Sequence, residues 1–275
     1  MDIVNRGIDF IFNLLFSPFA HVNPVWGMAV VSFVTGIVML FVFKATSDQA
    51  GIKKAKNVVK AHFLAIRLYR DDISLMFETM KNIIVSNLLY MKKSLRPMLF
   101  LIIPVGLILI QLGSRYEYRP LRVGERTVLT LRLDRTATLE DLSAVEMELP
   151  AGLSVETPPV RIEQLQEIDW RIKAEQPGSY EVAFKLAGRS VKKRIDVVDR
   201  LISVAPQIAR GKFSTTLMNP AEPSVPKSAS VFSIGLVYPK REFKLLGMHM
   251  HWLVAFFVLS LVFGFAFKGV LGVEL

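Results

Sequence analysis

The run from Val25 to Phe43 contains no charged residue, and this constrains the fold more than any other feature. At about 1.5 Å of rise per residue, a helix of this length just crosses a hydrocarbon core about 30 Å thick. Trp26 stands at one end, where an interface anchor belongs. Ser32, Thr35 and Gly36 mark a face suited either to close helix packing or to water. We therefore predict a transmembrane helix over residues 25–43.

Two further apolar runs predict two more crossings, over residues 97–113 and within residues 248–275. The first carries Pro104 in its middle, which predicts a kink, and Gln111 near its end. Because this run is short, the bilayer is expected to thin around it. The chain has 275 residues, 52% of them hydrophobic, and no cysteine. It therefore fits an integral membrane protein with a soluble part, and it excludes disulfides and cysteine zinc sites.

Residues 44–96 are rich in lysine and arginine and predict a cytoplasmic helical hairpin by the positive-inside rule. Apolar residues recur at helical spacing on both sides of a polar break at residues 70–72. The N-terminus and the segment after Leu112 are then outside. The basic face is expected to contact anionic lipid or ribosomal RNA, the alternative being a solvated face. Its candidate contact residues are Lys53, Lys54, Lys56 and Lys60.

Residues 1–24 alternate apolar and polar side chains in a helical pattern that is too short and too interrupted to span a membrane. We predict an amphipathic helix in the membrane interface, the alternative being a core helix of the bundle. Pro18 and Pro24 are expected to end it, because proline disfavours helix in the residue before it.

Residues 114–200 alternate apolar and polar side chains with period two, between turns rich in proline and glycine. This pattern predicts an all-β sandwich, inserted between the second and third crossings, with Trp170 in its core. Trp170 and the following Pro177–Tyr180 turn resemble the immunoglobulin-like modules of bacterial surface proteins. Residues 201–247 are polar and proline-punctuated and predict an outer linker or interfacial segment, within which Val231–Tyr238 is either a strand or interfacial.

No pattern in the chain indicates an enzyme. A phosphate-binding loop, a nucleophile elbow and paired intramembrane carboxylates are all missing from the sequence. His249 and His251 point to different sides of a helix or strand and have no third ligand nearby, so no metal site and no cofactor is expected. The net charge of +10 indicates membrane topology and headgroup contact rather than DNA binding.

The order of these elements resembles the YidC/Oxa superfamily of membrane protein insertases. It is closest to the three-crossing branch of archaeal YidC-like proteins and the third subunit of the ER membrane protein complex. The likeness rests on Phe43–Gln49, on the methionine-bearing hairpin and on Arg96–Leu112. Unlike the bacterial members, this chain has no arginine between Val25 and Phe43.

The resemblance implies a groove that shelters polar parts of a client helix as it enters the membrane. Its candidate groove residues are Ser32, Thr35 and Gln111. Its candidate client contacts at the cytoplasmic mouth, alternatively core-filling residues, are Met76, Met80, Met91 and Met98. The expected function is that of an insertase or insertion chaperone in a prokaryotic inner membrane, with client membrane proteins, lipid and the ribosome as partners. The alternative is an assembly subunit of a larger membrane complex, whose periplasmic β domain binds a partner.

Overall fold

The computed structural model describes residues 2–19, 22–68, 73–134, 137–186, 188–211, 220–226 and 230–274. Within its helices, some side chains are also outside the described set. The chain divides into two units. A β unit combines Met1–Gly27 with Ile108–Trp252, and a helical unit combines Met28–Leu107 with Leu253–Leu275.

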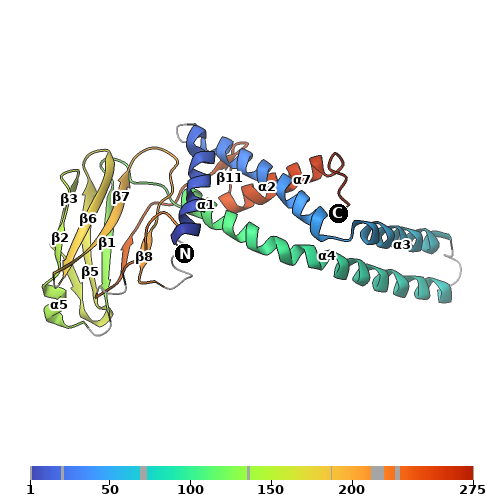
Figure 1. The fold of residues 1–275 in the computed structure, drawn as a ribbon, viewed down its shortest axis with the longest axis horizontal. Coiled ribbons are helices and arrows are strands. Elements are labelled where there is room, and N and C mark those ends of the chain that lie inside the picture. The colour runs from blue at the N-terminus through green and yellow to red at the C-terminus, as the bar shows by residue number, and fades with distance from the viewer. Residues whose placement is uncertain are drawn as a thin grey trace. The chain divides into compact units, whose positions relative to one another are not determined.

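Most helices lie in the first part of the described chain, and one lies near its end (Figure 1). They are α1 (Asp2–Phe16), α2 (Pro24–Thr46), α3 (Gln49–Leu68), α4 (Ile73–Tyr116), the short α5 (Leu139–Ser143) and α7 (Trp252–Phe267). By length and composition, α2 and the Met98–Tyr116 part of α4 could cross a membrane, and α7 is a shorter apolar helix. Helices of this kind were expected, while three crossings remain a prediction.

Helix α4 runs without a break from Ile73 to Tyr116, through both Pro97 and Pro104. The part of this helix that could cross a membrane is Met98–Tyr116, close to the predicted crossing over residues 97–113. Each proline removes one backbone donor, but the hydrogen bonds of the neighbouring turns maintain the helix. The predicted polar break at residues 70–72 lies outside the described residues, between the ends of α3 and α4.

Helix α1 ends at Phe16 and is followed by a single 3-10 turn, Ser17–Phe19. Its side chains Phe10, Ile11 and Leu14 are more than half exposed, whereas Phe16 is buried. The helix and its apolar exposed face agree with the sequence pattern, and its place at a membrane interface remains a prediction.

The β unit contains two antiparallel sheets that share one hydrophobic core (Figure 1). One sheet has the order β3-β5-β1-β9-β8 with β4 on β5, and the other has the order β2-β6-β7. Their strands are β1 (Arg126–Leu133), β2 (Glu146–Glu148), β3 (Leu153–Val155), β4 (Val160–Ile162), β5 (Glu167–Ala174), β6 (Gly178–Leu186), β7 (Arg189–Val197), β8 (Gln207–Ala209) and β9 (Val231–Leu236). A separate hairpin joins β10 (Lys244–Leu245) to β11 (Met248–His249).

Buried and more exposed side chains alternate along the strands of these sheets, and the buried ones form the core. Leu129, Leu131 and Leu133 of β1 are buried, while the residues between them are more exposed. Trp170 of β5 is also buried, and its ring lies 5.5 Å from that of Phe184 in the other sheet. The predicted β domain with Trp170 in its core is therefore confirmed.

The sequence predicted that the β domain ends at residue 200, but its strands continue beyond that residue. Strand β9 pairs with β1 in the middle of the larger sheet, and β8 pairs with β9. Within residues 201–247, β8 and β9 therefore belong to the β domain, and of the two interpretations of Val231–Tyr238 the strand is the one that the structure has. The reason is long-range pairing: the open edge of β1 is satisfied by a strand that follows it by about a hundred residues in the sequence.

Candidate functional site

The helical unit contains a cavity of about 350 Å³ between α2, α4 and α7. Its wall is almost entirely apolar, and some of its side chains, such as Leu261 and Phe265, are more than half exposed, so the cavity is not sealed. The lining residues are Thr35, Gly36, Met39, Leu40, Phe43, Leu101, Val105, Phe256, Phe257, Ser260, Leu261, Gly264 and Phe265. Of these described residues, only Thr35 and Ser260 carry a side-chain polar group.

Small residues bring α2 and α7 close together beside this cavity. Ser32 is buried, and its Oγ donates a hydrogen bond to the Phe256 carbonyl at 3.5 Å. A Cβ placed on Gly36 would lie 3.0 Å from the Ser260 carbonyl oxygen and 3.3 Å from the Gly264 nitrogen. Ser32 and Gly36 therefore serve close helix packing, which is one of the two roles that the sequence left open.

Two side chains in the cavity wall, Thr35 and Ser260, carry hydroxyl groups. Thr35 lines it directly, as the sequence analysis expected of a groove residue. The Oγ of Ser260 is buried and has no hydrogen-bond partner among the described residues. Leaving such a group unpaired costs about 1–3 kcal/mol.

The third predicted groove residue, Gln111, lies in the β unit. It is buried, and its Oε1 accepts a hydrogen bond from Arg115 Nη1 at 2.7 Å. Arg115 itself is buried, donates to Asn13 Oδ1 at 2.7 Å, and lies over the ring of Phe16. Arg115 was not among the predicted site residues, because the apolar run in the sequence ends at Leu112.

Three of the four predicted methionine contacts form one stripe along α4. Met80, Met91 and Met98 are each about half exposed. Met80 and Met91 are about three helical turns apart, and Met91 and Met98 are about two turns apart. Because these separations are close to whole turns, the three side chains lie on the same face of α4. The side chain of Met76 lies outside the described set. Because the described methionines are exposed, core filling does not account for them within this unit.

The four predicted basic contacts divide into two kinds. Lys53, Lys54 and Lys60 are exposed on α3, as a lipid or RNA contact would require. Lys56 instead lies 3.4 Å from the carboxylate of Glu274, near the C-terminus. That ion pair belongs to a contact between the chain end and α3 that the sequence did not predict.

The segment that begins at Phe43 has a structural role in this contact. Lys44 Nζ donates to the Leu271 carbonyl at 2.7 Å, and Gln49 Oε1 accepts from the Glu274 amide at 2.7 Å. Asp48 Oδ1 accepts from the Gly51 amide at 2.8 Å and so caps α3. The motif thus fixes the turn between α2 and α3 and holds the C-terminal residues against it.

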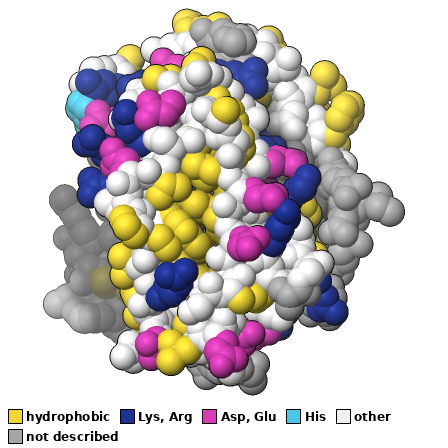
Figure 2. Space-filling view, turned by 90° about the vertical axis from the view of Figure 1, so that its left-hand side faces the viewer, with side chains coloured by type: hydrophobic (Ala, Val, Ile, Leu, Met, Phe, Trp, Pro, Cys, Tyr) yellow, Lys and Arg dark blue, Asp and Glu magenta, His cyan; other side chains and the backbone are white. Residues whose placement is uncertain are grey.

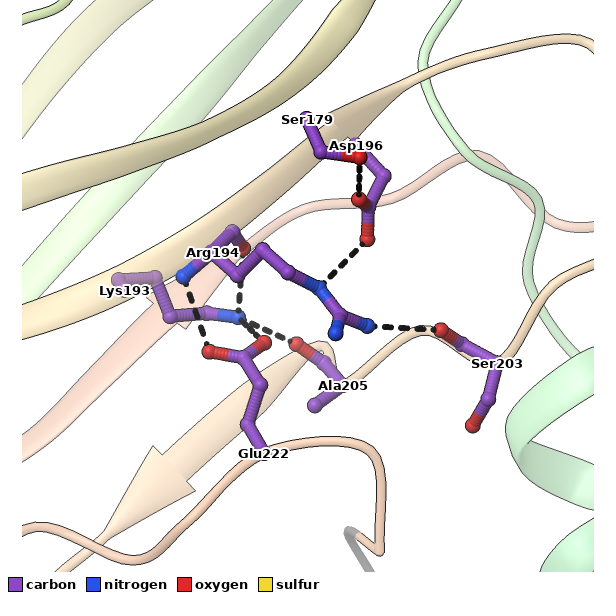
Figure 3. Close-up of polar contacts among 7 residues, drawn as sticks. All are labelled: Ser179, Lys193, Arg194, Asp196, Ser203, Ala205 and Glu222. Carbon is purple, nitrogen blue, oxygen red and sulfur yellow. Dashed lines mark hydrogen bonds and ion pairs between the residues drawn. The ribbon is translucent and has the colours of Figure 1, made fainter. Parts of the chain in front are cut away.

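The β unit contains a buried ionic network around Lys193 (Figure 3). Lys193 Nζ donates to the Glu222 carboxylate, to the Ala205 carbonyl at 2.7 Å and to the Arg194 carbonyl at 3.2 Å. Burial lowers the pKa of Lys193, and the Glu222 carboxylate opposes that change. With three acceptors around it, the ammonium group is not available as a nucleophile. The network instead fastens the segment around Ala205 and Glu222 onto β7.

The surface of the β unit carries a second hollow, of about 890 Å³. Phe232 and Leu165 line it and are about half exposed, and the Arg210–Asp134 ion pair at 2.7 Å stands beside them. Apolar side chains also gather on the face drawn in Figure 2, where acidic and basic side chains border them. Surfaces of this composition suit contact with another protein.

No described group of three or more histidine, aspartate or glutamate side chains lies close enough together to hold a metal ion. Comparison with protein-family models gives no match. Comparison with curated proteins gives no significant match either.

Proposed function

We propose that this protein is an insertion chaperone of the YidC/Oxa type, which receives apolar client helices in its helical unit and releases them into the bilayer. The cavity between α2, α4 and α7 is the observation that supports this proposal most directly. It offers an apolar wall with an unpaired hydroxyl, Ser260 Oγ, and it is open past Leu261.

The physical benefit lies in partial solvation of the client. A charged side chain at the bilayer centre costs about 2.5–3.5 kcal/mol on insertion scales. Hydroxyl groups such as those of Thr35 and Ser260 reduce the corresponding cost for polar groups by supplying hydrogen bonds inside an apolar surrounding. An apolar wall meanwhile favours helices that also belong in lipid.

The methionine stripe supplies a route to the cavity. Methionine is flexible and unbranched, so it adapts to apolar surfaces of different shape. Met80 and Met98 lie about 27 Å apart along α4, at about 1.5 Å per residue. Client segments would follow this stripe from the cytoplasm, with the exposed lysines of α3 near anionic lipid or the ribosome. In this proposal the hairpin is cytoplasmic and the β domain is on the outer side of a prokaryotic inner membrane.

Site-specific photocrosslinking tests the proposal with a matched pair of positions on α7. Leu261 lines the cavity and Val262 does not, although their exposed fractions are 58% and 56%. A photoreactive residue at position 261 is expected to trap nascent membrane proteins during synthesis, whereas one at position 262 is expected to trap lipid. Equal trapping of clients at both positions would argue against the cavity as the client site.

A second candidate function is that of an assembly subunit whose β domain binds one partner. The hollow beside Phe232 favours it, because a half-exposed aromatic side chain there has no role in the core. A photoreactive residue in place of Phe232 separates the two functions. Capture of one fixed protein there, with no client at position 261, would support assembly rather than insertion.

A further inference from the structure

The β10–β11 hairpin has an unusual turn. Lys244 pairs with His249 and Leu245 with Met248, which leaves a two-residue loop of Leu246 and Gly247. Both loop residues have positive φ, 50° for Leu246 and 82° for Gly247. Turns of this type favour asparagine followed by glycine, because a side chain with a branched apolar body is strained at positive φ. Leucine is therefore a poor choice for the turn itself.

Leucine is also a poor choice for contact with water. Leu246 is 91% exposed, and Met248 beside it is 59% exposed. Leu246 gains almost no free energy from burial, and Met248 is only partly covered. Strain and apolar exposure at the same position indicate that the side chain serves a contact outside the protein.

The root of the hairpin is the Lys244–His249 pair, and it lies close in sequence to the crossing predicted within residues 248–275. Trp252, the first residue of α7, donates from Nε1 to Glu117 Oε2 at 2.6 Å. Glu117 directly follows the Met98–Tyr116 span. Only Met250 and His251 separate the hairpin from Trp252, a reach of about 10 Å at 3.3–3.6 Å per residue. The tip, five residues before Trp252 in the sequence, lies within about 18 Å of this residue, whose type is common at membrane interfaces.

Both acidic and basic groups lie at this root, where the Glu242 carboxylate is 3.9 Å from His249 and the Glu117 carboxylate is 3.3 Å from His251. Arg241 donates from Nε to the Arg115 carbonyl at 3.2 Å, while its buried Nη2 has no hydrogen-bond partner among the described residues. Burial lowers the pKa of Arg241, Arg119 and Arg122 act in the same direction, and the acidic groups of Tyr116 and Asp199 oppose them. Lys244 is exposed on the hairpin. An anion at this place would interact favourably with exposed Lys244 and with the accessible part of the Arg241 side chain.

We infer that the β10–β11 hairpin anchors the β domain to the surface of the bilayer. Leu246 and Met248 enter the boundary between headgroups and acyl chains, while Arg241 and Lys244 bind phosphate groups of phospholipids. Its apolar tip and basic flanks match the composition of segments that lie in the membrane interface. The inference goes beyond the proposed function, because the anchor is the same whether the helical unit inserts clients or only supports a complex.

Spin labelling tests this contact in the full-length protein, reconstituted in nanodiscs of phosphatidylethanolamine and phosphatidylglycerol. Because the chain has no cysteine, Leu246→Cys creates a single labelling site. Val160→Cys on β4 is the matched control, since Val160 is 58% exposed and belongs to the β domain. The measurement compares collision of the nitroxide with oxygen, which concentrates in lipid, and with a water-soluble nickel chelate.

The label at position 246 is expected to collide severalfold more with oxygen than with the chelate, and the label at position 160 to show the opposite order. A label at position 248 is expected to lie at an intermediate depth. Chelate access at position 246 equal to that at position 160 would overturn the anchor, and so would low access to both reagents, which indicates a protein contact. Arg241→Gln is expected to move the label at position 246 toward water, and an unchanged depth would overturn the phosphate contact.

Discussion

Gly36→Ala tests whether the separation of α2 and α7 depends on a missing side chain. The added Cβ would meet the Ser260 carbonyl oxygen at 3.0 Å and the Gly264 nitrogen at 3.3 Å. Both are backbone atoms of α7, so no side chain can rotate away to relieve the contact. The two helices must therefore shift apart, and the cavity that they border with α4 must change.

Gly264→Ala is the matched control, because a Cβ on Gly264 would meet nothing within 4 Å. In both variants, alanine gains about 1 kcal/mol over glycine in intrinsic helix propensity. That gain cancels when the two are compared. The difference is then the cost of overpacking, about 1–3 kcal/mol. We expect Gly36→Ala to be less stable than Gly264→Ala by this amount.

The assay is reversible unfolding in mixed micelles with increasing denaturing detergent, followed by helical circular dichroism. The free energies of unfolding of the two variants are compared under identical conditions. Both glycines line the cavity, but only a Cβ on Gly36 displaces α7, so client crosslinking at Leu261 is expected to fall more in Gly36→Ala than in Gly264→Ala. If the two variants were equally stable and captured clients equally, the close packing of α2 on α7 and its link to the cavity would both be refuted.

Two further predictions concern the β domain. Lys193→Met leaves the buried Glu222 carboxylate without its ammonium partner, and we expect a loss of about 3–5 kcal/mol in the free energy of unfolding. Adding Glu222→Leu should restore much of that loss in a double-mutant cycle, and a purely additive second loss would contradict the pairing. The Arg119 guanidinium, which binds both oxygens of Glu125, lowers the pKa of that carboxyl. Its stabilisation is therefore present above the ordinary glutamate pKa of about 4.3 and is lost as the pH falls through the lowered value. Glu125→Gln should cost about 1 kcal/mol at neutral pH and flatten the acid limb of the stability curve, whereas an unchanged acid limb would argue against the ion pair.

The alternating strands of the β domain were predictable because their signal is local. Apolar and polar side chains alternate within Arg126–Leu133 itself, and the structure forms strand β1 there. Strand β9 was not assigned securely, since its position depends on a partner about a hundred residues earlier. Among the predicted site residues, Thr35 lines the cavity, while Ser32 is used in packing and Gln111 binds Arg115. Sequence spacing identifies polar residues in an apolar run, but it does not show which of them face one another.

The sequence by itself determined the apolar helices, the basic segment between them and the two-sided strands. Each of these follows from a repeat within one segment, because hydrophobic burial selects side chains at the period of the backbone. Only the tertiary structure decided that Ser260 has an unpaired hydroxyl, that Gln49 binds the chain end, and that Lys193 is buried among acceptors. These depend on contacts between segments far apart in the chain, where distance and orientation, rather than residue type, decide which groups are paired.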